Sequence, residues 1–134
     1  MNRPMSPAPE NAEVAGPLLG VCNAMVGVYK QAFGRGPTKA RAHFAGPDLL
    51  VVLLEHTLTV GERNLVALGQ HERLRELRLF THYALEDELR SIVERALDRR
   101  TIAFMSGIDI RRDLSVELMT LEPLRTFAGS RAHC

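Results

Sequence analysis

An unbroken run of six aliphatic residues, 49–54, constrains the fold of this chain more than any other feature of its sequence. Such a run is typical of a strand that is covered on both faces of a sheet. Residues 46–48, Gly-Pro-Asp, precede it with turn chemistry, and residues 40–44 alternate between apolar and polar as a half-exposed strand does. The segment from Thr38 to Leu58 is therefore predicted to form a β-hairpin.

A first helix is predicted from about Asn11 to Phe33, where apolar residues recur at three- and four-residue steps. Gly34 and Pro37 follow it as C-terminal stop signals. More than one side of this helix is apolar, which exceeds what one contact with a sheet requires. Burying a side chain such as Leu18 contributes about 1.5–3 kcal/mol. We therefore expect a symmetric homodimer that buries the surplus through this helix.

Two further helices are predicted in the second half of the chain. Thr59 and Glu62 have the spacing of a capping box, which indicates a short helix that runs to about Leu68. A long helix is expected over about 71–98, with its leucines on the buried side. Its charged residues, Arg78 among them, are expected in solvent.

A second hairpin closes the predicted domain, with strands at 101–108 and 114–121. In the latter, Leu114, Val116 and Leu118 alternate with polar residues and are expected to face the core. The predicted fold is α+β, in the order α-ββ-α-α-ββ. Its four-stranded, mostly antiparallel sheet carries the helices on one face.

The length of 134 residues fits one domain, which we place at residues 11–123 between flexible tails at 1–10 and 124–134. Cys22 lies in an apolar stretch and Cys134 is the last residue, so a framework disulfide is not expected. This cysteine usage is typical of a reducing cytoplasm. The most apolar segment is shorter than the ~20 residues that span a bilayer, so no direct membrane insertion is expected.

Composition disfavours a nucleic-acid-binding module, which we keep as an alternative hypothesis. The chain has 17 Lys+Arg and 16 Asp+Glu, so a net charge of +1 gives no field that steers a polyanion. Aromatic residues make up 5% of the sequence and Trp is absent, which leaves few groups for stacking on bases. Salt-sensitive binding in a titration at low salt would favour this alternative.

Gly34 and Gly36, on either side of Arg35, lie in the stretch FGRGPTK, which superficially resembles a phosphate-binding loop. The motif GxxxxGK[ST] is not present, and the glycines follow a helix C-terminus, where the dipole repels phosphate. We interpret the glycines as a chain reversal. A weaker interpretation is an anion site, since an arginine beside exposed backbone amides can hold a small oxyanion.

A third hypothesis is an uncharacterised enzyme that uses His43 and His56, which could face each other across the first hairpin. Two histidines without a third ligand make a poor zinc site, and no metal is expected. No Ser-His-Asp or Cys-His motif occurs, so no catalytic residue is assigned. Asp109 and Asp113 flank the last turn and are interpreted as turn support, in preference to a divalent-ion loop.

Five segments, in order along the chain, resemble the MpsC-like family. They are VYKQAFGRGPTKA at 28–40, Leu58-Thr59 with Glu62, LRELR at 74–78, TIAFMSGID at 101–109 and VELMTLEP at 116–123. The resemblance covers residues 13–123, and its most specific element is GRGPT after a helix that contains Tyr-Lys. The family usually has proline where Val60 stands, a difference that leaves the cap intact.

This resemblance implies a non-enzymatic, soluble accessory or regulatory protein of a cation-translocating, membrane-potential-generating system that is also linked to bicarbonate supply. The transport subunits of such a system are separate membrane proteins, so a membrane-transporter partner is implied. No cofactor is expected. The motif positions carried over as structural are Gly34, Pro37, Thr59 and Glu62. The motif positions carried over as candidates for binding a small anion or ligand are Arg35, Gly36, Thr38 and Arg78.

Overall fold

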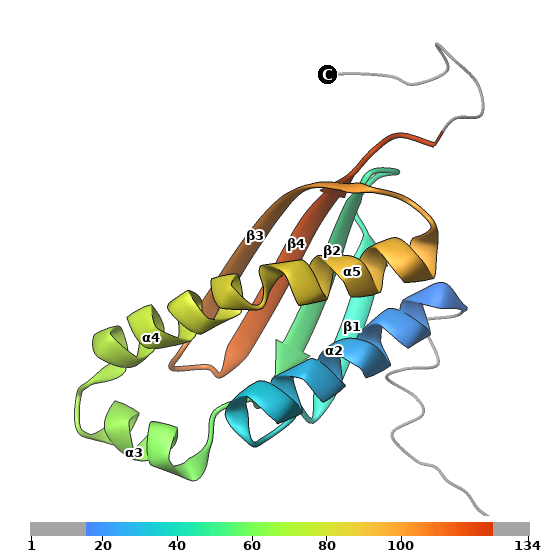
Figure 1. The fold of residues 1–134 in the computed structure, drawn as a ribbon. Coiled ribbons are helices and arrows are strands. Elements are labelled where there is room, and N and C mark those ends of the chain that lie inside the picture. The colour runs from blue at the N-terminus through green and yellow to red at the C-terminus, as the bar shows by residue number, and fades with distance from the viewer. Residues whose placement is uncertain (1–15, 125–134) are drawn as a thin grey trace, which may run out of the picture.

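The computed structural model describes residues 16–124 and has an α+β fold (Figure 1). Its elements are α2 (Pro17–Phe33), β1 (Lys39–Phe44), β2 (Leu49–Glu55), α3 (Val60–Ala67), α4 (His71–Ala84), α5 (Glu86–Leu97), β3 (Thr101–Asp109) and β4 (Leu114–Leu121). The four strands form one antiparallel sheet in the order β1-β2-β4-β3. Helices α2, α4 and α5 lie over one face of it, while α3 lies past its end. The predicted fold class and both hairpins are confirmed.

Helix α2 packs within its own chain. Proline at its first position and Gly34 in the left-handed region, with φ 79°, bound it, and the Gly34 amide donates to the carbonyl of Lys30. Its buried residues, Val21, Cys22, Met25 and Tyr29, belong to the main core. Five more apolar residues of this helix pack partly buried against that core: Leu18, Leu19, Val26, Val28 and Phe33.

The apolar side chains of the first helix, which led us to predict a dimer through it, thus pack against the core of their own subunit. The oligomeric state stays a prediction. The expected helix start at Asn11 lies outside the described residues. So do the two predicted tails, apart from Leu124.

The single long helix predicted over 71–98 is wrong, because α4 ends and α5 begins at Leu85. Leu85 has φ −92° and ψ 4°, which is outside regular helix geometry. The next three residues, Glu86, Asp87 and Glu88, form an acidic first turn, which is favourable at a helix N-terminus. The element order is therefore α-ββ-α-α-α-ββ.

The face of α4 that meets the core also differs from the prediction. Leu74, Arg78 and His82 are buried, whereas Leu77 is 61% exposed. Residues four apart share one side of a helix, so burial of Leu74 and His82 carries Arg78 inward with them. An arginine is buried in this way when its guanidinium finds partners inside the protein, as described below.

Strand β4 turns the opposite face to the core from the one predicted. Ser115 and Glu117 are fully buried under the helices, and Leu114, Val116 and Leu118 lie half-buried on the other face. The last two residues of the buried set are Met119 and Leu121, which are apolar. The alternation of a strand divides its side chains between two faces of the sheet. It does not tell which face is buried when both faces carry apolar side chains.

The aliphatic strand β2 is fully buried on one face only, so the predicted cover on both faces is wrong. Leu50, Val52 and Leu54 are buried, and their neighbours alternate with them as half-buried residues. Among residues 16–124 no helix covers the second face of the sheet. We call it the open face; its apolar residues are Leu49, Val51, Leu53, Met105, Leu114, Val116 and Leu118.

The predicted capping box is present at the start of α3. The Glu62 amide donates to Thr59 Oγ1 at 3.1 Å, and the Thr59 amide donates to Glu62 Oε1 at 2.9 Å. Thr59→Ala is expected to lower the free energy of unfolding by about 1 kcal/mol in a urea titration. Thr59→Ser keeps the hydroxyl and serves as the matched control. Equal losses in both variants would show that the hydroxyl does not act as the cap.

Candidate functional site

Several residues singled out in the sequence converge on one connection, His56–Thr59, between β2 and α3. Arg35 Nε donates to the carbonyl of His56 at 3.1 Å, and Thr38 Oγ1 lies 2.6 Å from His56 Nδ1. His56 has φ 63°, an uncommon conformation for a non-glycine residue. These two contacts hold it there.

Gly36 lets the segment that carries Arg35 and Thr38 approach α2 closely. A Cβ atom at this position would lie 3.3 Å from Val26 Cγ1 and 3.4 Å from Lys30 Cβ. Glycine is thus favoured at position 36 by close backbone approach, whereas the positive φ expected of a chain reversal occurs at Gly34 and not at Gly36.

The side chain of Arg78 binds both this connection and the first turn of α3. Its Nη2 donates to the carbonyl of Thr57 at 2.7 Å and to Glu62 Oε1 at 2.7 Å, and its Nε donates to Glu62 Oε2 at 3.0 Å. The guanidinium is 1% exposed and its Cζ lies 3.6 Å from the ring centroid of Phe33. Burial alone would raise the pKa of Glu62, but hydrogen bonds from Arg78 and Thr59 outweigh it and hold this pKa below its ordinary value.

Asp113 holds the same connection from the β3–β4 turn. Its Oδ1 accepts from the amides of Thr57 at 2.8 Å and Leu58 at 3.2 Å. Asp109 accepts from the amide of Arg112 at 3.1 Å, which is an Asx turn. The predicted turn support is therefore seen for Asp109, whereas Asp113 accepts from amides 56 and 55 positions earlier and supports the β2–α3 connection instead of its own turn.

Three of the four anion candidates reach this connection, and the four do not surround a common cavity. Arg35 and Thr38 reach His56, Gly36 packs on α2, and Arg78 is buried against Thr57 and Glu62. Neither of the two cavities described below is lined by any of them. Anion binding by this set stays a prediction.

His43 and His56 do not face each other, so the geometry assumed for a histidine pair is wrong. The register pairs His43 with Val51 and Lys39 with Glu55, so His56 follows the opposite end of the hairpin. In residues 16–124 no three His, Cys, Asp or Glu side chains cluster closely enough to hold a metal ion.

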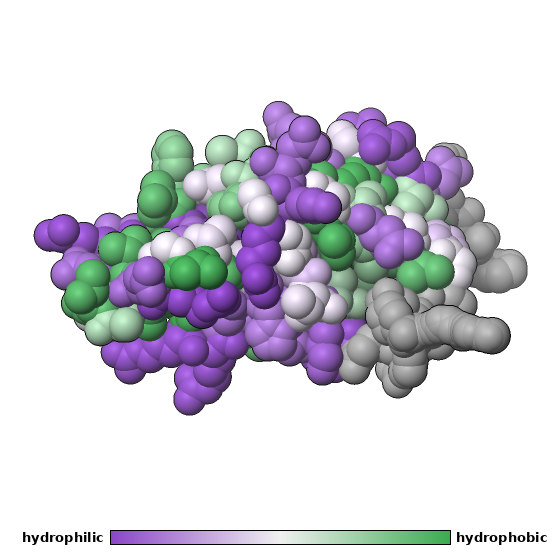
Figure 2. Space-filling view, turned by 90° about the horizontal axis from the view of Figure 1, so that it is seen from below, coloured by the Kyte–Doolittle hydropathy of each residue, from purple (hydrophilic) through white to green (hydrophobic). Residues whose placement is uncertain are grey.

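Helix α3 follows this connection and buries none of its residues. Val60 is 66%, Leu65 41% and Leu68 73% exposed. Figure 2 views the molecule from the end where α3 lies and shows apolar side chains gathered around it among hydrophilic ones. The end of the molecule that the motif residues hold in place therefore exposes apolar side chains among hydrophilic ones.

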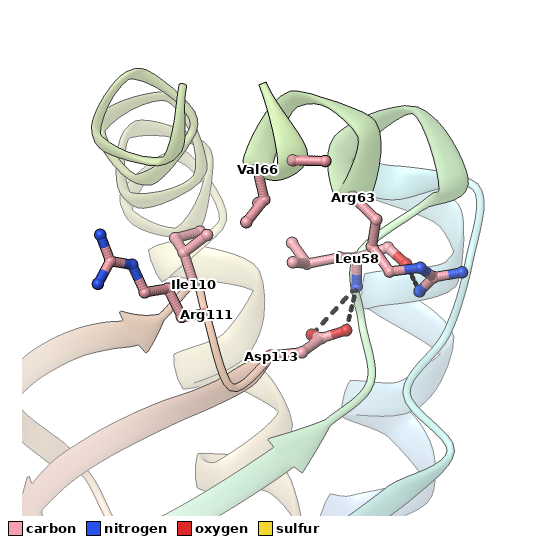
Figure 3. Close-up of a pocket in the computed structure, with 7 residues that line it drawn as sticks. Leu58, Arg63, Val66, Ile110, Arg111 and Asp113 are labelled. Carbon is pink, nitrogen blue, oxygen red and sulfur yellow. Dashed lines mark hydrogen bonds between the residues drawn. The ribbon is translucent and has the colours of Figure 1, made fainter. Parts of the chain in front are cut away.

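A cavity of about 240 Å³ lies between α3 and the β3–β4 turn. Leu58, Val66 and Ile110 point into it, while the side chains of Arg63 and Arg111 lie at its two sides (Figure 3). Arg63 is oriented by a 2.9 Å hydrogen bond from its Nη1 to the carbonyl of Leu58. This arrangement can accept an apolar group and offers cations beside it.

A second cavity, of about 390 Å³, lies on the other side of Ile110 and Arg111. Its lining is charged and includes His71, Arg75 and Asp109. Arg111 Nη2 lies 2.9 Å from His71 Nε2, which links the turn to the start of α4. The β3–β4 turn thus separates an apolar cavity from a polar one.

A buried polar cluster lies between α2, α4 and the sheet, and its members were not singled out in the sequence. The Tyr29 hydroxyl donates to Glu117 Oε2 at 2.5 Å and lies 3.5 Å from His82 Nε2. His82 Nδ1 lies 2.8 Å from Ser106 Oγ and 3.7 Å from Glu117 Oε2. One sequence feature could have indicated this cluster. Glu117 lies two positions before Met119 in the same strand, so the two side chains point to the same face of the sheet.

Burial sets the protonation of the cluster. Burial, against hydrogen bonds from Tyr29 and Ser106, raises the pKa of Glu117 to about 7, and burial together with Arg78 lowers the pKa of His82 to about 4. The same burial, with Glu117 beside it, raises the pKa of Tyr29. Between about pH 4 and pH 7 the close approach of His82 to Glu117 is thus a contact between mostly neutral groups. Oε1 of Glu117 is buried without a partner among the described residues.

A protein-family model matches most of the chain. The model of a family described as "Na+-translocating membrane potential-generating system (MpsC)" matches residues 20–123. No curated protein and no solved structure matches the chain. Among the described residues, no helix is long and apolar enough to cross a membrane.

Proposed function

The chain belongs to the MpsC family. From this and from the geometry of α3, we propose that it is a non-enzymatic, cytoplasmic accessory protein of a Na+-translocating, membrane-potential-generating system. It acts by docking a partner protein on a surface that we call the α3 platform. The platform comprises the exposed side chains of Val60, Leu65 and Leu68 and the cavity lined by Val66 and Ile110.

The observation that carries this proposal is a helix that is firmly anchored although none of its residues is fully buried and only Val66 packs, half-buried, against apolar core residues. An eight-residue helix is marginal by itself in water, because nucleation fixes several residues for one hydrogen bond. Here the capping box and the contacts of Arg78 and Asp113 with the preceding connection hold it in place. Because α3 contributes only one half-buried apolar side chain to the core, we infer that its anchoring serves to present a docking surface.

The chemistry of the platform favours a partner segment with an apolar side chain and neighbouring acidic groups. The apolar side chain would fill the cavity against Leu58, Val66 and Ile110. Carboxylates beside it would meet the guanidinium groups of Arg63 and Arg111, which suit bidentate hydrogen bonding. A segment of this kind on a transport subunit, outside the membrane, is the expected occupant.

The test is complementation of a deletion strain in the organism that makes the protein. Loss of the chain is expected to lower the Na+-dependent part of the membrane potential, measured with a potential-sensitive dye. Val66→Glu places a charge in the cavity and should fail to restore it, while Leu77→Glu, on the exposed side of α4, should restore it. An unchanged potential in the deletion strain would overturn the assignment to this system. Full restoration by Val66→Glu would overturn the platform.

A further inference from the structure

We propose that the open face of the sheet binds the open face of a second copy of this chain, with the two-fold axis parallel to the strands. This interface is separate from the α3 platform, which lies past the end of the sheet. It also differs from a dimer through the first helix, whose apolar residues pack against their own core.

The open face is apolar where it is central. Strands β2 and β4 occupy the middle of the sheet, and on this side they present six aliphatic residues, four of which form two adjacent cross-strand pairs. Val51 lies beside Leu118, Leu53 beside Val116, and Met105 on β3 continues the row with 50% of its surface exposed. Sheets with an apolar face of this kind pack face to face at about 10 Å, with strands aligned to within about 30°.

The charges at the rim of the open face select a second copy and its orientation. On this face the first cross-strand row runs Lys39, Glu55, Leu114 and Asp109 from β1 to β3. A two-fold axis parallel to the strands keeps each row at its own level and places β1 of one copy opposite β3 of the other. Lys39 of each copy then faces Asp109 of its partner, twice in the dimer.

The other in-plane axis, perpendicular to the strands, is disfavoured by the same charges. It would place β1 opposite β1 and bring Lys39 and Arg41 of the two copies together, where Glu55, which pairs with Arg41 at 3.1 Å, offsets only part of their positive charge. Like charges across an interface are unfavourable, so the face itself discriminates between the two arrangements. A self-complementary patch of this kind is what a two-fold dimer requires.

The size of the patch predicts a dimer of low affinity. From strand spacing and rise, four strands of seven residues cover roughly 19 by 23 Å. That footprint, roughly 440 Å² per copy, is smaller than the ~800 Å² per partner of a standard stable interface, so a weak dimer that dissociates in the micromolar range is expected. The full chain is therefore tested by sedimentation equilibrium between about 1 and 100 μM, where its mass should rise from 14.9 kDa toward twice that value.

The apolar part of the inference is tested with Leu118→Lys, which places a charge at the centre of the open face. The dissociation constant should rise at least about 100-fold, since an unpaired charge would be buried. Leu77→Lys, on exposed α4, is the matched control and should leave it unchanged. Circular dichroism and a thermal melt show whether each variant folds, and Lys39→Glu below gives a second readout at a surface position.

The orientation is tested with charge variants. Lys39→Glu would place a carboxylate opposite the partner's Asp109 and should weaken the dimer about 10-fold or more at low salt. Adding Asp109→Asn should restore most of the affinity, because asparagine keeps the acceptor of the Asx turn and removes the charge. Lys30→Glu on α2 is the control. A monomer at all concentrations, or a dimer indifferent to both Leu118→Lys and Lys39→Glu, would overturn the proposal.

Discussion

Glu117→Gln is expected to stabilise the folded protein relative to the native chain by an amount that grows by about 3 kcal/mol between about pH 4.5 and about pH 8. The reason is that the carboxyl of Glu117 is fully buried, and burial raises its pKa from 4.5 to about 7. That difference corresponds to about 3 kcal/mol of differential proton binding between the folded and unfolded states. Glutamine has no proton to lose and escapes the cost of burying a charge.

The sign follows from which state holds the proton more tightly. The folded state keeps Glu117 protonated up to about pH 7, whereas the unfolded chain loses this proton near 4.5. The stabilisation from Glu117 is therefore complete below pH 4.5 and is lost as the pH rises through about 7. His82 acts in the opposite direction, because its folded-state pKa is lowered from 6.5 to about 4. Its contribution is complete above pH 6.5 and is lost as the pH falls through about 4.

The measurement is the free energy of unfolding in urea at several pH values for both chains and for His82→Gln. Between about pH 4.5 and 6.5 the two contributions nearly cancel in the native chain. Each variant removes one contribution and leaves the other. As the pH falls, the free energy of unfolding of Glu117→Gln should therefore decrease, and that of His82→Gln should increase. Glu76→Gln on exposed α4 controls for the loss of a surface carboxylate. Parallel pH profiles in the native chain and Glu117→Gln would show that Glu117 is ionised in both states.

The fold was predictable from the sequence wherever local chemistry decides it. The turn at 46–48, the capping box of Thr59 and Glu62, and the glycine after Phe33 each act within a few residues. They set the hairpins and the helix ends correctly. The break at Leu85 was missed because apolar residues recur at helical spacing on both sides of it, so periodicity continues across it.

The faces of the elements were less predictable, because burial of a polar residue depends on partners far away in the sequence. Glu117 is buried against Tyr29, which lies 88 positions earlier, and Arg78 reaches Thr57 across 21 positions. Hydrophobicity alone places such residues in solvent. The α3 platform was missed for a related reason. The sequence shows that Leu65 and Leu68 are apolar, but it does not show that these side chains remain exposed in the folded protein.

Arg78→Met is expected to lower the free energy of unfolding by about 3–5 kcal/mol. Methionine keeps much of the volume against Phe33 but removes both hydrogen bonds to Glu62 and the one to the carbonyl of Thr57. A carboxylate that loses its buried partner and a buried carbonyl that loses its donor account for a loss of this size. Arg78→Lys should recover little of it, because a single ammonium cannot bridge Glu62 and Thr57 with the geometry of a guanidinium.

A double variant separates the ion pair from the backbone contact. If the unpaired carboxylate causes most of the loss, Arg78→Met with Glu62→Gln should be more stable than Arg78→Met alone, which a double-mutant cycle in urea measures.

Amide hydrogen exchange should show where the anchoring acts. In Arg78→Met the amides of α3 should exchange faster than the drop in global stability requires. The amides of β2 should exchange only as fast as that drop predicts. A loss below about 1 kcal/mol in Arg78→Met, with unchanged exchange in α3, would mean that this helix is held without Arg78. The anchoring on which the proposed docking surface depends would then have to come from Asp113 and the capping box alone.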